Sequence, residues 1–190
     1  MAKSVLKTVR ASDAVSTAGA KDHLNVTGTE HDVLISNIIK SAQQTVEDYT
    51  GRKLSSETWY LYLDEFPKGD IVLPYSPVTS VTSVKYYDAN NSEQTYVANT
   101  DYYLDLNGEP ARIRDVSGWD GTYDKPNAVT VEYVTGYTRT NIPEPLRSAM
   151  RLLIADMYDN RMDKPSERFT TWKALCYPYR IWRNVYDNEP

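Results

Sequence analysis

A change of hydrophobic period, from helical to strand-like and back, leaves few folds open to this 190-residue chain. Between residues 29 and 51, apolar side chains recur at steps of three and four, which aligns them on one face of a helix. From Glu57 to about Tyr137, strand-like runs are joined by short Asn- and Gly-containing turns. A second helical pattern begins at Pro143. Connections this short favour antiparallel pairing, because parallel strands need a crossover between them. The sequence therefore predicts an α+β fold: a small helical bundle from both chain ends, with an inserted antiparallel β-sheet.

The ends of the two helices carry recognisable signals. The segment "TEHD" has the spacing of a capping box from Thr29, with Asp32 standing where Glu or Gln is usual. Gly51 can adopt the left-handed conformation that closes a helix. Asn141 can cap the second helix, and Pro143 and Pro145 fit only its first turn, since a deeper proline costs about 3 kcal/mol. These signals predict helices over about 29–51 and 143–161.

The same patterns divide the chain into three parts. Residues 1–19 show little periodicity and are rich in small polar residues, so we expect a flexible N-terminal arm. Residues 20–165 form the body, with the β insertion at about 57–137. Residues 166–190 form an aromatic C-terminal segment interrupted by Pro178, too apolar to remain a free tail.

Composition excludes several classes of protein. With 41% hydrophobic and 25% charged residues, the composition is neither that of a disordered chain nor that of a membrane-embedded one. The first residues, "MAKSVLKTVRASDAV", lack the apolar region of a secretory signal, so we expect none there. A net charge of −5 argues against broad adhesion to nucleic acid, which requires clustered Lys and Arg. The single cysteine, Cys176, permits no internal disulfide, and we interpret it as a small apolar residue on a helix. The chain contains sixteen Tyr and four Trp but only two Phe. Tyr and Trp rings combine an apolar body with a polar group, so this bias indicates surfaces that take part in protein interfaces.

Catalytic and cofactor motifs are weak. His23 and His31 lack the spacing of a metal site, and we interpret both as surface residues. An acidic series along a helix end lacks the glycine-centred loop of a calcium site; its members are Asp156, Asp159, Asp163 and Glu167. No phosphate-binding glycine loop or nucleophile elbow is present in the sequence. We therefore expect no enzyme activity and no cofactor.

Two features indicate binding surfaces. Met150, Leu152 and Ile154 widen the apolar stripe of the second helix, so that helix is buried on more than one side or meets another subunit. The aromatic strands also leave open a carbohydrate-binding surface, because Tyr rings stack on sugars. The alternation of aromatic residues is equally expected if the strands are simply amphipathic. The tyrosines concerned are Tyr60, Tyr62, Tyr86 and Tyr87.

The order of several motifs resembles the head-tail connector (adaptor) proteins of long-tailed bacteriophages and prophages. The resemblance rests on these segments in sequence: "VEDYTGRKL" (46–54), "FPKGDIVLPYSPVTSVTSVKYYD" (66–88), "DYYLD" (101–105), "AVTVEYVTGY" (128–137) and "IPEPLRSAMRLLIADMYDNR" (142–161). "CYPYR" (176–180) also looks like the ending of relatives.

The resemblance implies a structural protein of the virion neck, made in the host cytoplasm. It implies a ring of about twelve copies beneath the portal protein, built by contacts between two different patches on each copy. The ring would extend the channel for double-stranded DNA, which passes without specific binding, and would carry a tail-side neck or stopper protein. Within this frame we expect Met150, Leu152 and Ile154 at the subunit interface. The portal-docking residues we expect are Phe169, Trp172, Tyr177, Tyr179, Arg180 and Trp182. The alternatives are another neck protein, such as a stopper, and a carbohydrate-binding module.

Overall fold

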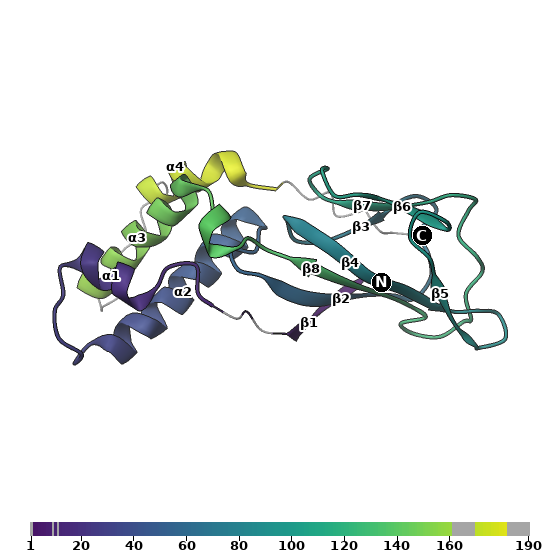
Figure 1. The fold of residues 1–190 in the computed structure, drawn as a ribbon, viewed down its shortest axis with the longest axis horizontal. Coiled ribbons are helices and arrows are strands. Elements are labelled where there is room, and N and C mark those ends of the chain that lie inside the picture. Colours follow the sequence, from purple (N-terminus) through teal and green to yellow (C-terminus); the bar gives the residue numbers. More distant parts are fainter. Residues whose placement is uncertain (1, 9, 11, 161–169, 182–190) are drawn as a thin grey trace. The chain divides into compact units, whose positions relative to one another are not determined.

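The computed structural model describes residues 2–8, 10, 12–160 and 170–181, and it confirms the α+β fold class (Figure 1). The chain divides into two compact units. A β unit comprises Met1–Arg10, Ser56–Gly136 and Ile181–Pro190, and a helical unit comprises Ala11–Ser55 and Tyr137–Arg180. The chain thus enters and leaves the main β segment through the helical unit, as the change of hydrophobic period predicts.

The β unit contains two antiparallel sheets rather than the single sheet predicted. The first has five strands, in the order β1 (Lys3–Thr8), β2 (Glu57–Leu63), β8 (Val129–Thr135), β4 (Val78–Tyr87) and β5 (Glu93–Tyr96). The second has three, in the order β3 (Ile71–Val72), β7 (Arg112–Asp115) and β6 (Tyr102–Asp105). A two-residue strand and two four-residue strands carry too short a pattern for the sequence to assign them to a separate sheet.

One core joins the two sheets. Along β8, Val129, Val131 and Tyr133 are buried while the residues between them are partly exposed, the alternation expected of a sheet with one covered face. Ile71 and Ile113 of the smaller sheet belong to the same buried cluster. The smaller sheet therefore covers one face of the larger, and the opposite face of the larger sheet stays accessible.

The predicted N-terminal arm has regular structure. Residues 3–8 form β1, an edge strand paired antiparallel with β2, in which Val5 lies opposite Tyr60. All but one of the β1 residues are exposed, so no alternation of apolar and polar residues marks this strand in the sequence. Residues 17–24 then form α1, whose first turn is capped by the Ser16 hydroxyl, which accepts from the Gly19 backbone N–H at 3.1 Å.

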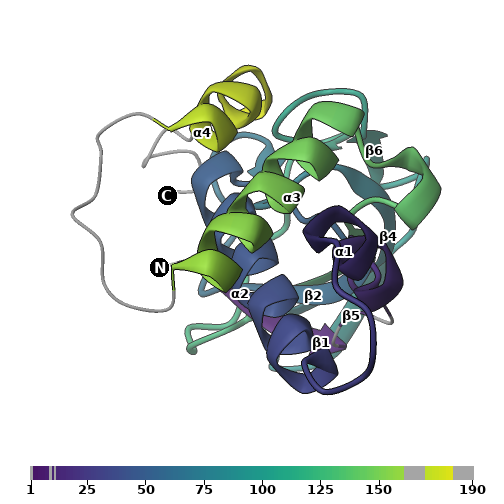
Figure 2. The ribbon, with the colours of Figure 1, turned by 90° about the vertical axis from the view of Figure 1, so that its left-hand side faces the viewer.

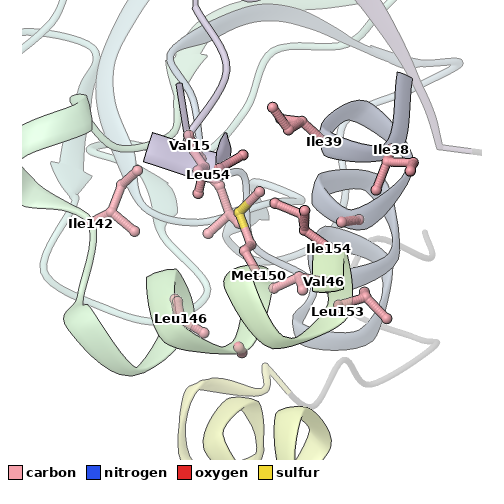
Figure 3. Packing of buried hydrophobic residues seen from close by; sticks show 14 of the residues in the cluster. Val15, Ile38, Ile39, Val46, Leu54, Ile142, Leu146, Met150, Leu153 and Ile154 are labelled. Carbon is pink, nitrogen blue, oxygen red and sulfur yellow. The ribbon is translucent and has the colours of Figure 1, made fainter. Parts of the chain in front are cut away.

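In its described residues, the helical unit contains four α-helices, which Figure 2 shows from one end. They are α1 (Thr17–Leu24), α2 (Asp32–Thr50), α3 (Glu144–Asp159) and α4 (Thr171–Cys176), with 3-10 turns η1 (Arg139–Asn141) and η2 (Tyr177–Tyr179). Helix α3 contacts each of the other three. Their shared core contains Ile35, Ile39 and Val46 of α2 beside Leu146, Met150 and Ile154 of α3 (Figure 3).

Some of the helix-end predictions are confirmed and others are not. Gly51 has the left-handed conformation, with φ at 72°, and its N–H donates to the Glu47 carbonyl at 2.8 Å. Pro143 and Pro145 lie at the start of α3, as predicted. The capping box at Thr29 does not form, because α2 begins at Asp32 and its N-cap, His31, makes no side-chain capping bond. Asn141 belongs to η1 instead of capping α3.

Candidate assembly surfaces

The C-terminal segment is held against the helical unit by Arg52, which follows α2. Its Nε donates to the Tyr179 carbonyl oxygen at 2.6 Å and its Nη1 donates to the Tyr137 hydroxyl at 3.2 Å. Tyr49 adds two ring contacts: an edge-on contact with Trp172 at 5.4 Å between centroids, and the Arg180 guanidinium 5.2 Å from its own ring centre. The end of α2 therefore fixes where α4 and η2 lie.

The segment that carries Arg52 is itself fixed by a buried polar network. Gln43 accepts from the Ala14 backbone N–H at 2.9 Å and donates to Glu47 at 2.7 Å and Ser55 at 3.0 Å. Glu47 in turn pairs with Lys53 at 3.1 Å, and both side chains are almost wholly buried. Because buried polar groups are costly unless they are paired, this network specifies one path for residues 52–55.

The six predicted portal-docking residues fall into three groups. Phe169 and Trp182 lie outside the described residues. Trp172 and Tyr179 are half-buried and pack against the helical core. Tyr177, at 53% exposure, and Arg180 are exposed on and beside η2. Of the four described residues, Tyr177 and Arg180 are therefore accessible, whereas Trp172 and Tyr179 contribute to packing within the helical unit.

The three predicted interface residues of α3 also differ from one another. Met150 and Ile154 are completely buried and point into the cluster of Figure 3. The neighbours that α3 contacts in its own chain explain why its apolar surface exceeds one face. Leu152 is 39% exposed, so it alone of the three keeps surface for another subunit.

The tyrosines considered as a sugar platform do not share one face. Tyr60 and Tyr62 lie together on the accessible face of the larger sheet, with ring centroids 5.6 Å apart. Tyr86 faces the core, where its hydroxyl donates to Asp120 at 2.9 Å. The Lys7 ammonium lies 5.0 Å from the centre of the Tyr60 ring and also pairs with Glu132 at 2.8 Å. These contacts account for Tyr60 and Tyr86 within an amphipathic sheet.

Three arginines that the sequence analysis did not single out surround a hollow of about 260 Å³ in the helical unit. Arg147 and Arg151 of α3 line it with Arg139 of η1 and with residues at the start of α1. Glu144 accepts from Arg147 at 3.0 Å and from Arg151 at 2.9 Å. Spacings of three and seven residues on one helix could have indicated this shared pair, but not the third arginine beside it.

The polar residues weighed for metal binding are dispersed. His31 makes an edge-on contact with Tyr158 at 5.8 Å, and His23 is exposed. Asp156 accepts from the Asn160 side chain at 2.9 Å, while Asp163 and Glu167 lie outside the described residues. Within the described ranges, no group of three or more His, Cys, Asp or Glu side chains is placed to hold a metal ion. The helices described there also include none with the length and apolarity to cross a bilayer.

Comparison with known proteins gives two consistent results. A family model, the phage gp6-like head-tail connector protein, matches residues 18–105. Among solved structures, the neck of an empty gene transfer agent (GTA) particle computed with C6 symmetry shares the fold with a TM-score of 0.81, at 24% identity over 96% of this chain and 97% of that one. The virion of a native GTA particle gives 0.80 at 23% identity, and the neck of a native GTA particle computed with C12 symmetry gives 0.75 at 21% identity, each with the same coverage. No curated protein sequence gives a significant match.

The chain is thus similar to phage head-tail connector proteins over residues 18–105 and shares its fold with proteins of GTA necks. More narrowly, the predicted resemblance to head-tail connector proteins is confirmed, by the family model over residues 18–105 and by the fold over nearly the whole chain. The family match also supports the structural connector role. It favours neither the stopper nor the carbohydrate-binding alternative.

Proposed function

We propose that this chain forms a ring in the neck of a phage-like virion, beneath the portal protein, and joins the packaged head to the tail. The family match and the fold shared with neck structures computed with C6 and C12 symmetry carry this proposal. A ring of identical chains closes through heterologous contacts, in which one patch of each copy meets a different patch of the next. A ring of about twelve copies is compatible with both C6 and C12 symmetry, because twelve is a multiple of six.

The ring would extend the channel for double-stranded DNA without binding it specifically. A protein that grips DNA neutralises phosphates with clustered Lys and Arg. This chain has a net charge of −5, which suits a wall past which DNA slides. On the side away from the portal, the ring would offer a platform to a tail-side neck or stopper protein.

Portal docking is assigned to the surface at η2. Tyr177 and Arg180 are exposed there, and a tyrosine beside an arginine is typical of the residues that dominate protein interfaces. Arg52, Tyr49 and Trp172 hold the segment in place, which lowers the entropy cost of docking. Contact between copies would include Leu152 on the exposed side of α3.

The test of portal docking is a binding measurement with the portal protein of the same phage or prophage, comparing Tyr177→Ala with Tyr103→Ala. Tyr103 lies on β6 and is 54% exposed, so the two substitutions remove equal amounts of accessible tyrosine from different surfaces. We expect Tyr177→Ala to weaken binding at least about tenfold, as for an interface hot spot, and Tyr103→Ala to leave it unchanged. Equal binding by both variants would overturn the assignment of docking to η2 while leaving the ring itself to be tested separately.

A further inference from the structure

The hollow rimmed by Arg139, Arg147 and Arg151 has the chemistry of a carboxylate-binding site. The other residues that line it are small or apolar: Ala14, Val15, Ser16, Gly19 and Thr140. A guanidinium group carries five N–H donors and binds carboxylates with two parallel hydrogen bonds. Arg147 also donates to the Arg139 carbonyl at 2.7 Å, and Arg139 donates to the Asp13 carbonyl at 2.8 Å. The ten N–H donors of Arg147 and Arg151 still exceed the number that this carbonyl and the single carboxylate of Glu144 can accept. The site therefore has capacity for a second carboxylate.

The two units of the chain differ in charge. The described part of the β unit carries thirteen Asp and Glu against eight Lys and Arg, whereas the described part of the helical unit carries nine of each. Opposite charges on two different patches favour association in one relative orientation and oppose the alternatives. The described helical unit is neutral overall, so its positive patch is the local arginine group of the hollow, while the described β unit carries the net negative charge.

One acidic group on the β unit is well placed for such a contact. Asp64, Glu65 and Asp124 are exposed and line a single hollow next to the end of β2. The Asp64 carboxylate accepts from the Asn127 backbone N–H at 2.9 Å, which fixes this loop in one conformation. Lys125 lines the same hollow, so this group keeps a net negative charge, opposite in sign to the three arginines and one glutamate at the other hollow.

We propose that the arginine-rimmed hollow binds the acidic loop at residues 64–65 and 124 of a second copy of this chain. The contact joins the helical unit of one copy to the β unit of the next. This inference rests on the proposed ring, and it identifies two patches through which neighbouring copies would contact each other. It also places charge pairs within the copy-to-copy interface, so the stability of the ring falls as salt concentration rises.

Charge reversal tests the pairing directly. The hollow variant is Arg147→Glu with Arg151→Glu, and the loop variant is Glu65→Lys with Asp124→Lys. In a ring made of either variant alone, like charges face each other at every junction. We therefore expect the yield of rings on assembled portal, counted by electron microscopy, to fall at least about tenfold. An equimolar mixture restores rings in which the two variants alternate, because every junction then pairs opposite charges. The chain carrying all four substitutions restores them as well.

Two controls separate this contact from misfolding and from other roles. Lys40→Glu changes an exposed charge elsewhere on α2 and should leave ring yield unchanged. Arg151→Glu alone spares the bond from Arg147 to the Arg139 carbonyl, and we expect this variant to fold and to weaken the ring less than the double variant does.

Full rings from either single-patch variant, or no rescue on mixing, would overturn this contact but not the proposal that the chain forms a ring. Loss of portal binding by intact rings of the hollow variant would assign the hollow to the portal. No ring from the unmodified chain would overturn both proposals.

Discussion

The Arg52 guanidinium and the Tyr179 carbonyl oxygen, 127 positions apart in sequence, are joined by a 2.6 Å hydrogen bond. The same side chain also reaches the Tyr137 hydroxyl, where the chain returns to the helical unit. One residue thus connects the end of α2 with two later segments. The placement of the proposed docking surface depends on this connection.

Arg52→Ala should loosen the C-terminal segment while the rest of the helical unit stays folded. A hydrogen bond to a charged group contributes about 1.5–3 kcal/mol, and lysine cannot reproduce the forked geometry, so Arg52→Lys should recover only part of it. Hydrogen exchange of residues 171–181 measures the effect, with Lys40→Ala on exposed α2 as the control. Unchanged protection in Arg52→Ala would show that Trp172 and Cys176 alone hold the segment.

Gln43→Ala should destabilise the helical unit far more than the neighbouring Gln44→Ala. Gln43 is fully buried and bonded to Ala14, Glu47 and Ser55, so its removal leaves buried groups unpaired at a cost of about 1–3 kcal/mol each. Gln44 is exposed, and its side-chain amide donates to Asp48 at 2.8 Å, a surface contact that contributes little to stability. Urea unfolding compares the two variants, and similar midpoints would contradict the role given to the network.

Met150→Ala and Leu152→Ala should separate core packing from subunit contact. Met150 is completely buried, and its truncation should lower the free energy of unfolding by about 2–5 kcal/mol. Leu152 is 39% exposed, so Leu152→Ala should change stability little and act on ring formation. Thermal melting of the free chain, followed by ring assembly on portal, measures both effects. A stable Met150→Ala chain that fails to assemble would reverse this assignment.

The Cys176 thiol should report whether α4 is docked. Burial raises its pKa to about 11, because the charged thiolate is disfavoured away from water. The unfolded thiol ionises more readily, so this group's contribution to stability is present below pH 9 and is lost as pH rises toward 11. Labelling with a thiol reagent at pH 8 should therefore be slow in the native chain and faster in Arg52→Ala. The Cys176→Ala variant should therefore lose less stability than the unmodified chain between pH 9 and pH 11.

Much of the fold is predictable from the sequence because the hydrophobic period changes at element boundaries. The stripe of α2 and the alternation of β8 each follow from local spacing, and both are observed. Strand β1 is not predictable in this way, because it is exposed on both faces and owes its conformation to pairing with β2, more than fifty residues away. The split into two sheets likewise depends on contacts between short, distant segments.

The assembly surfaces were predictable in composition but not in orientation. Sequence shows that the C-terminal segment is aromatic, yet only the fold shows that Trp172 faces Tyr49 while Tyr177 faces solvent. In the same way, Met150 and Leu152 are two apolar residues of one helix that differ completely in burial. The arginine hollow escapes sequence reading because Arg139 lies on η1, outside the helical spacing of Arg147 and Arg151.

The central claim is tested most directly by electron microscopy of the full chain mixed with its cognate portal, assembled and purified beforehand. The account predicts a closed ring of this protein on one end of the portal, with η2 at the junction and the helical unit of each copy against the β unit of the next. A correctly assembled portal that carries no copies of the chain would contradict it.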